Sequence, residues 1–173
     1  NCTSVNGCDH GTHVAGIAAG TSDTLTGVAP DASLIAIQVF SHVEDRQEDD
    51  GEDDEVDRCL DAGYLTPCLL SSWSNLILAL EHVYSLRDTY EIAAVNMSLG
   101  ACCSIGYCDS FSLKPAIDNL RSVGIATVVS SGNDRKINRI SLPACISTAI
   151  SVGSTTNADE ISHFSNVADI LDL

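Results

Sequence analysis

The sequence has few basic residues, few aromatic residues and no long hydrophobic run. Lys and Arg together number 8 against 24 Asp and Glu, which gives a formal net charge of −16. A protein this acidic repels phosphate backbones, so we expect no nucleic-acid partner. No segment approaches the roughly 18 consecutive apolar residues of a membrane-spanning helix, and no basic-then-apolar leader opens the chain. We therefore expect no membrane partner.

Two motifs that indicate other kinds of site are also absent from the sequence. No Gly-rich loop joins a predicted strand to a predicted helix, which argues against a nucleotide-binding α/β domain. No Cys-x-x-Cys pair occurs, and the five histidines are not spaced to complete a zinc site with the cysteines. We therefore expect no metal site built from these residues and no required cofactor.

Cysteines, by contrast, are abundant. Eight cysteines in 173 residues are many for a reducing cytosol, and their even number favours disulfides in an exported protein. Short separations along the chain favour Cys2 with Cys8, Cys59 with Cys68, and one of Cys102 or Cys103 with Cys108, which leaves the other for Cys145.

The length of the chain fits a single domain, within which one segment differs in composition. The chain begins with Asn1 and stops after Asp169–Leu173 without a turn residue, so we expect a domain that is truncated at both ends. Ten acidic residues lie between Glu44 and Asp57. Because a block of like charge is usually a solvated loop, residues 44–72 are predicted to form an acidic, cysteine-containing insertion.

Apolar runs and segments with helical spacing alternate along the rest of the chain. Such alternation predicts an α/β fold, in which helices pack on both faces of a parallel β-sheet. The runs that we expect to form buried strands are Ser33–Phe40, Ile92–Met97, Ile125–Val129 and Thr148–Val152. The residues with helical spacing are Leu76, Leu80, Val83 and Tyr84 in one segment, and Leu113, Ala116, Ile117 and Leu120 in the next.

Polar residues follow two of the predicted strands. In open α/β sheets, ligands bind beyond the carboxyl ends of the strands, and here Asn96–Gly100 and Ser130–Asp134 take that position. An extended edge at Ser98, Leu99 and Gly100 could hydrogen-bond to a peptide as an added strand. Considered alone, each of these segments could equally be an ordinary turn.

A more specific pattern lies near the start of the chain, where small residues at positions 15, 16, 18 and 19 predict a closely packed, buried helix. The string at 10–20 is His-Gly-Thr-His-Val-Ala-Gly-Ile-Ala-Ala-Gly. It resembles the segment around the catalytic histidine of the subtilases, a family of serine endopeptidases. Other matching segments follow in the family's order over nearly the whole chain, the acidic insertion excepted: Gly27–Pro30, Asn96–Gly100, Ser131–Asn133 and Ser151–Gly153.

This resemblance implies a subtilisin-like, three-layer α/β/α catalytic domain that cleaves polypeptide substrates through an acyl-enzyme. His10 would be the general base that takes a proton from the serine nucleophile. Asn133 would donate its side-chain amide to the oxyanion of the tetrahedral intermediate. The two walls of the substrate groove would be formed by Ser98, Leu99 and Gly100 and, facing them, by Ser130, Ser131 and Gly132.

The resemblance also indicates that parts of the catalytic machinery lie outside these residues. The family's triad runs Asp, His, Ser along the chain, but only nine residues precede His10, and no Gly-Thr-Ser-Met nucleophile motif occurs. Gly20-Thr21-Ser22 matches only the start of that motif, and a helix rising about 1.5 Å per residue would put Ser22 roughly 15–18 Å from His10. We therefore expect the triad Asp and Ser to lie elsewhere, and the 173 residues alone to be inactive.

Several broader expectations complete this interpretation. Structural calcium is common in the family, but the stretch after Gly20 is short and offers no ligand loop of the usual kind. We expect a secreted monomer. The alternative function is that of a noncatalytic subtilase-like domain, which would bind a protein partner through the groove and the acidic insertion.

Overall fold

The structure is a computed structural model, which describes residue 5, residues 7–45 and residues 58–173. The chain divides into two compact units, Asn1–Asn75 and Leu76–Leu173. Each unit has its own secondary structure and its own buried side chains, and each is described by itself below.

The first unit contains a short antiparallel sheet, one strand of which is joined by a disulfide to a short helix. Strand β1 (Ser41–Val43) pairs with β2 (Cys68–Leu70), and the four-residue helix α2 (Arg58–Asp61) lies between them in the sequence. Cys59 and Cys68 form the expected disulfide. The small core of this region consists of Val43 and the two half-cystines, with Leu70 packed against them. Residues 58–72 of the predicted insertion therefore contain regular secondary structure, while residues 46–57, most of its acidic block, lie outside the described part.

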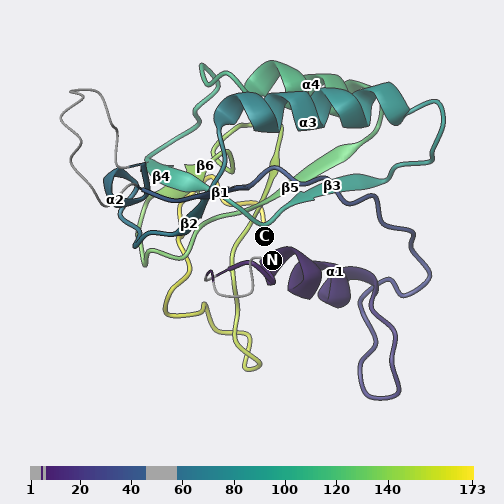
Figure 1. Cartoon of the computed structure of the whole chain (residues 1–173), viewed down its shortest axis with the longest axis horizontal. Coiled ribbons are helices and arrows are strands. Elements are labelled where there is room, and N and C mark those ends of the chain that lie inside the picture. Colours follow the sequence, from purple (N-terminus) through teal and green to yellow (C-terminus); the bar gives the residue numbers. More distant parts are fainter. Residues whose placement is uncertain (1–4, 6, 46–57) are drawn as a thin grey trace. The chain divides into compact units, whose positions relative to one another are not determined.

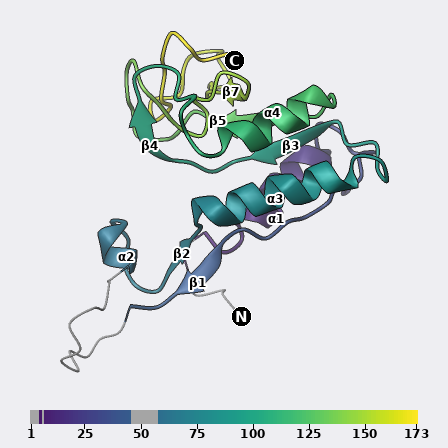
Figure 2. The same ribbon diagram turned by 90° about the horizontal axis from the view of Figure 1, so that it is seen from above.

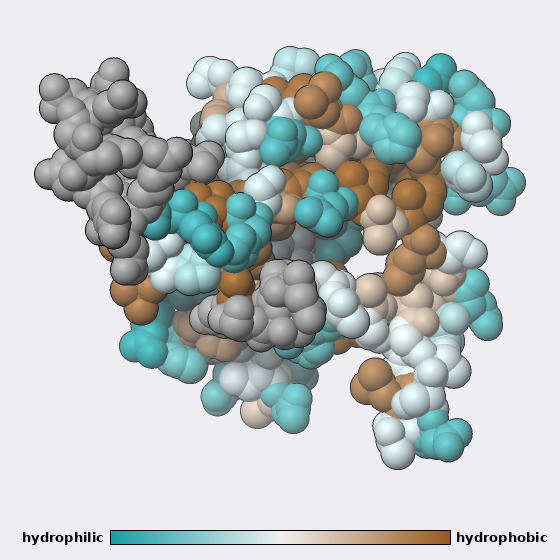
Figure 3. All heavy atoms as spheres, in the orientation of Figure 1, coloured by the Kyte–Doolittle hydropathy of each residue, from teal (hydrophilic) through white to brown (hydrophobic). Residues whose placement is uncertain are grey.

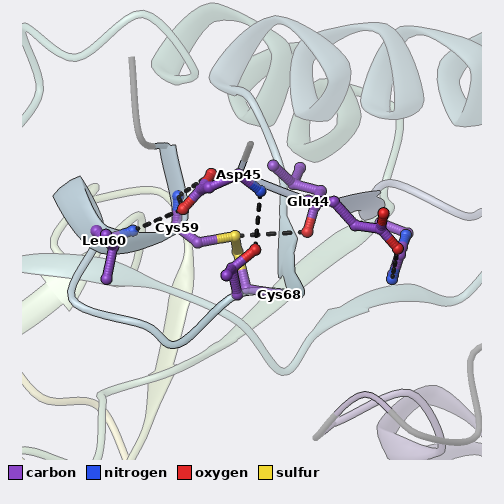
Figure 4. Close-up of a disulfide and its surroundings, with 8 residues drawn as sticks. Glu44, Asp45, Cys59, Leu60 and Cys68 are labelled. Carbon is purple, nitrogen blue, oxygen red and sulfur yellow. Dashed lines mark hydrogen bonds and ion pairs between the residues drawn. A yellow bond between two sulfur atoms is a disulfide. The ribbon is translucent and has the colours of Figure 1, made fainter. Parts of the chain in front are cut away.

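The carboxylate of Asp45 fixes the start of α2. Its oxygens accept hydrogen bonds from the backbone N–H of Cys59, at 3.1 Å, and of Leu60, at 3.2 Å (Figure 4). The N–H of Asp45 donates in turn to Thr66 Oγ1 at 2.8 Å. Because the first N–H groups of a helix have no partner within it, a carboxylate in this place acts as a cap.

Helix α1 (His10–Ala19) forms where the sequence predicts it, but it is not buried: none of its residues is classed as buried. Its small residues allow a close approach by a loop. The backbone N–H groups of Val28 and Ala29 donate to the carbonyl groups of Ile17 and Ala18, and a Cβ on Gly27 would meet the backbone of Ala19 at 2.8 Å. The close packing was therefore predicted correctly, whereas its expected consequence, burial, was wrong.

The segment Ser33–Phe40 corrects a second prediction, because it is not a strand. Its apolar side chains are exposed, Leu34 by 54% and Ile35 by 47%. Its backbone N–H and C=O groups make no hydrogen bond to the strands that the structure describes in the first unit. An apolar run becomes a buried strand only where a neighbouring strand accepts its backbone hydrogen bonds, and composition does not specify that neighbour.

The second unit contains the parallel sheet. Its strands β3 (Ala94–Met97), β5 (Ala126–Ser130) and β7 (Ile150–Val152) lie in the order β3-β5-β7. Met97 lies opposite Val129, and Ser130 lies opposite Val152, so the three strands end at the same edge. Strands β3 and β7 lie within the apolar runs that predicted them, and β5 extends one residue beyond its run, to Ser130. A separate antiparallel pair, β4 (Ala101–Ser104) and β6 (Ile140–Leu142), was not predicted.

Two helices cover one face of this sheet. Figure 1 shows α3 (Trp73–Leu86) and α4 (Lys114–Ser122) on the same side of β3 and β5, and Figure 2 shows them from above. Helix α3 buries Leu76, Leu80 and Val83, while its outer surface mixes polar and apolar residues (Figure 3). Helix α4 buries Ala116, Ile117 and Leu120, and the chain turns at Gly124 with φ of +83°. The α/β class is confirmed, while a helix layer on the other face stays a prediction.

The second unit also contains a disulfide that differs from the expected pairing. Cys108 bonds to Cys145 across a sequence separation of 37, not to Cys102 or Cys103. The N–H of Cys108 donates to the carbonyl of Cys145, so the fold itself brings the two segments together. Cys103 is a free thiol, and Cys8 is disulfide-bonded, although its expected partner Cys2 lies outside the described residues. Separation along the chain was a poor guide because tertiary structure, not chain distance, determines this pair.

Candidate active site

A pocket of about 200 Å³ lies at the edge where the three parallel strands end. All of it belongs to the second unit. Its lining includes Ser98 after β3, Ser130–Asn133 at the end of β5, and Gly153–Ser154 after β7. The pocket therefore occupies the position beyond the carboxyl ends of the strands that the sequence indicated.

The structure brings most of the predicted groove residues to this pocket. Ser98, Ser130, Ser131 and Gly132 line it together with Asn133. Two other predicted residues, Leu99 and Gly100, are not part of the lining. The carbonyl of Leu99 accepts a hydrogen bond of 3.4 Å from Ser130 Oγ, which links the two predicted walls. A Cβ on Gly100 would lie 2.9 Å from the carbonyl oxygen of Leu142, so this residue packs against β6.

The lining of the pocket is neutral. It contains hydroxyl groups, amides and Val side chains but no charged residue. Several hydroxyls already have partners: Ser98 Oγ accepts from Asn96 Nδ2 at 2.9 Å, and Ser154 Oγ lies 2.8 Å from Ser162 Oγ. This lining suits a neutral side chain better than a charged one, because a buried charge needs a partner.

Asn133 lines this pocket with a carboxamide that takes no part in holding the fold together. Its side chain is exposed and makes no hydrogen bond with any residue that the structure describes. It follows Gly132, whose φ of +106° is accessible to glycine and strained for other residues. A carboxamide in this position is free to donate a hydrogen bond to a ligand in the pocket.

One buried residue at this site was missed by the sequence analysis. Asn166 has 0% of its surface exposed, and it is hydrogen-bonded to the loop that carries Asn133. Its local sequence, Phe164-Ser165-Asn166-Val167, has no spacing or composition that distinguishes it from a turn. Only the folded chain reveals its contacts.

His10, the predicted base, is the first residue of α1 and is exposed. The backbone N–H of His10 donates to the carbonyl of Gly7 at 3.1 Å. His10 lies in the first unit and Asn133 in the second, so their expected convergence on one point stays a prediction. Ser22, the residue in the partial nucleophile motif, has a local role: its Oγ accepts hydrogen bonds from the N–H groups of Thr24 and Leu25.

The residues that the structure describes offer neither a metal-binding cluster nor a membrane-spanning helix. No group of three or more His, Cys, Asp or Glu side chains among them could hold a metal ion. None of their helices is long and apolar enough to cross a membrane.

Comparisons with known proteins relate this geometry to a family. The model of the Subtilase family matches residues 3–171. The extracellular serine proteinase of Thermus sp. (strain Rt41A) is 32% identical over 164 residues, which cover 95% of this chain and 31% of that protein. The major intracellular serine protease of Bacillus subtilis (strain 168) is 32% identical over 170 residues, which cover 95% of this chain and 43% of that protein.

Solved structures agree with these sequence matches. The prenylagaramide maturation protease PagA matches with a TM-score of 0.66 and 26% identity, over 93% of this chain and 48% of that one. The protease domain of PatA, at 18% identity and a TM-score of 0.63, shares the fold. The chain spans less than half the length of the relatives named here. Because the family model matches nearly all of the sequence, the chain belongs to the subtilase family.

Proposed function

We propose that the protein containing these residues is a serine-type endopeptidase that cleaves polypeptides through an acyl-enzyme. The observation that carries the proposal is the neutral pocket at the ends of β3, β5 and β7, which Asn133 lines with a free carboxamide. Membership of the subtilase family supports it. The names of relatives in the family describe serine proteinases.

In this proposal, His10 transfers protons and Asn133 stabilises negative charge. His10 takes the proton from a serine nucleophile and later gives it to the leaving amine. Asn133 donates its amide N–H to the oxyanion as negative charge develops on the carbonyl oxygen. One such donor contributes about 3 kcal/mol to transition-state stabilisation, a magnitude measured on a related subtilase. The triad Asp and Ser are proposed to lie outside the 173 residues.

The substrate proposal rests on membership of the subtilase family and on the place of Ser98 and Ser130–Gly132 in the lining of the pocket. A polypeptide would lie in extended form along Ser98, Leu99 and Gly100, with backbone hydrogen bonds like those of an added strand. Ser130, Ser131 and Gly132 would form the facing wall. One substrate side chain would enter the neutral pocket between them.

The proposed setting is extracellular. The disulfides Cys59–Cys68 and Cys108–Cys145 suit an oxidising compartment. One relative is named an extracellular proteinase, and another is named intracellular, so the disulfides support this proposal more strongly than the relatives' names do. A monomer that needs no cofactor for catalysis is part of the proposal, whereas structural calcium rests on the family resemblance alone.

The test compares the full-length parent protein with the 173 residues alone. Both are assayed on a denatured protein and treated with a fluorophosphonate, which labels only an activated serine. We expect cleavage and labelling for the parent and neither for the short form. An inactive, unlabelled parent that still binds unfolded polypeptide would favour the noncatalytic alternative, and activity of the short form would overturn the assignment of the triad.

A matched pair of variants tests Asn133 in the parent. Asn133→Ala removes the proposed oxyanion donor, so kcat should fall by about 10²–10³ with little change in KM. Asn157→Ala removes an exposed carboxamide in a turn that does not line the pocket and should leave both constants unchanged. Equal effects of the two substitutions would contradict the role of Asn133.

A further inference from the structure

The side chain of Asn166 is buried against the loop that carries Asn133, and both of its ends are used. Its Oδ1 accepts hydrogen bonds from the backbone N–H groups of Asp134, at 2.9 Å, and Lys136, at 3.0 Å. Its Nδ2 donates to the backbone carbonyl of Ser131 at 3.1 Å. One carboxamide therefore binds the loop before Asn133 and after it.

The backbone of Asn166 makes further hydrogen bonds to the loop that carries Asn133. Its N–H donates to the carbonyl of Gly132 at 2.9 Å, and its own carbonyl accepts from Ser131 Oγ at 2.8 Å. Residues 131, 132, 134 and 136 are thus all tied to Asn166. Asn133 itself lies within the tied segment and keeps a free side chain.

The loop needs such support because its backbone is unusual. Gly132 has φ of +106° and Arg135 has φ of +57°, both in regions that are sparsely populated by residues other than glycine. A Cβ on Gly132 would collide with Asn166 Nδ2 and Ser141 Oγ, so the loop and the buried carboxamide fit closely. Backbone conformations of this kind persist where the surroundings hold them in place.

We propose that Asn166 is a positioning residue, which orients the carboxamide of Asn133 toward the oxyanion. The inference rests on the proposed peptidase function. An oxyanion donor is effective when its direction is fixed before the reaction begins. Asn133 has no hydrogen bond of its own with a described residue, so its direction depends on the backbone that Asn166 holds.

The chemistry of the contact requires a carboxamide at position 166. Two backbone N–H groups need an acceptor, and the Ser131 carbonyl, which also accepts from the Ser141 N–H, takes its second hydrogen bond from a donor at position 166. A carboxylate supplies the acceptor but not the donor, and it would also face the carboxylate of Asp134, whose Oδ2 lies 3.2 Å from Asn166 Nδ2. Asn166→Asp therefore removes half of the contact with almost no change in shape.

The kinetic test uses the full-length parent and a double-mutant cycle. We expect Asn166→Asp to lower kcat about ten-fold or more while KM changes about two-fold or less. In an Asn133→Ala background, the same substitution should lower kcat less than about two-fold further, because its target is already absent. Asn157→Asp makes the same chemical change in an exposed turn and should have no effect. Independent, multiplicative losses from the two sites would overturn the proposal.

A second measurement does not depend on activity. In hydrogen exchange on the parent, the amides of Asp134 and Lys136 should be protected, and Asn166→Asp should increase their exchange rates while Asn157→Asp does not. If Asn166→Asp does not fold, Asn166→Ser, which removes most of the contact without adding charge, replaces it. Protected amides in an inactive parent would overturn the peptidase proposal alone. Freely exchanging amides in an active parent would overturn the positioning role alone.

Discussion

Two apolar segments of the molecule, Ser33–Phe40 in the first unit and Ile125–Ser130 in the second, have similar compositions and different structures. Ile125 and Val129 are almost fully buried, and β5 has a neighbouring strand on each side. Leu34 and Ile35 are exposed, and their segment pairs with no described strand of the first unit. The difference shows that apolar composition gives a buried strand only where neighbours supply backbone partners and a covering layer.

The same contrast extends to what holds each unit together. The second unit contains most of the buried apolar side chains, and its helix α4 packs against β5. The regular part of the first unit has a small core built around a disulfide and the Asp45 carboxylate. We therefore expect side-chain packing to contribute most to the stability of the second unit. In the first unit we expect the disulfide and the Asp45 hydrogen bonds to contribute most.

Removing a core side chain of the second unit should have the largest effect. Leu120 on α4 is fully buried, so Leu120→Ala should lower the free energy of unfolding by about 2–5 kcal/mol. Leu78→Ala, on the exposed side of α3, is the matched control and should cost less than about 0.5 kcal/mol. Urea unfolding measures both, and similar midpoints for the two variants would contradict the packing of α4.

Removing the Cys59–Cys68 disulfide should have the next largest effect, confined to the first unit. Replacing both cysteines with Ala should destabilise the β1–β2 pair by about 2.5 kcal/mol, because the unfolded chain gains freedom. Hydrogen exchange of the β1 and β2 amides measures this change, with the amides of β5 as an internal reference. Cys103→Ala removes a free thiol and serves as the control. A loss of protection in β5 would show that the two units are not independent.

Removing the cap on α2 should have a smaller effect on the same region. Asp45→Ala deletes the acceptor of the Cys59 and Leu60 N–H groups and should cost about 1 kcal/mol. Asp31→Ala, at an exposed carboxylate that makes no hydrogen bond or ion pair with a described residue, should be neutral. The amide exchange rates of Cys59 and Leu60 report the difference, which would vanish if the carboxylate contributed nothing.

The smallest expected effect is a pH dependence in the second unit. A hydrogen bond from Lys114, and then one from Thr148, lower the pKa of Asp118. A lowered folded pKa means that the pair stabilises the fold above the unfolded pKa, and that this contribution disappears as pH falls through the folded value. Asp118 is partly exposed, so the effect should stay below about 1 kcal/mol.

The pH dependence can be measured by urea unfolding of the wild type and Asp118→Asn between pH 6 and pH 2.5. The wild type should be more stable at pH 6, and the difference should shrink as the carboxylate is protonated. Added salt should reduce it as well. A difference that grows toward low pH would contradict the direction of the pKa change.

The elements that could be predicted from the sequence are those whose environment follows from local pattern. In β5 every second residue is buried, and in α4 the buried residues lie on one face of the helix. Their sequences therefore show apolar residues at the spacing of a strand and of a helix, respectively. The antiparallel pair β4–β6 has no such pattern, because Ala101–Ser104 is short and only weakly apolar. The Ser33–Phe40 prediction was wrong because pairing partners are a property of the whole fold.

The candidate site could be predicted in part for the same reason. Ser130–Asn133 follow a recognisable strand and match a family motif, and the structure places them in one pocket. Asn166 lies 33 residues further along the chain and contributes through hydrogen bonds to backbone groups, which any loop sequence offers. The Cys108–Cys145 bond likewise depends on two segments that meet only in the folded protein.

That bond has a consequence for how the protein tolerates damage. It closes a covalent ring of residues 108–145, which includes α4, β5 and the loop that carries Asn133. A single peptide-bond cut at an exposed position within the ring, such as Ile137, leaves both pieces attached through sulfur. Such a nicked molecule would migrate as one chain in a gel without reductant and as two with it, so loss of mass would require two events: a cut and a reduction.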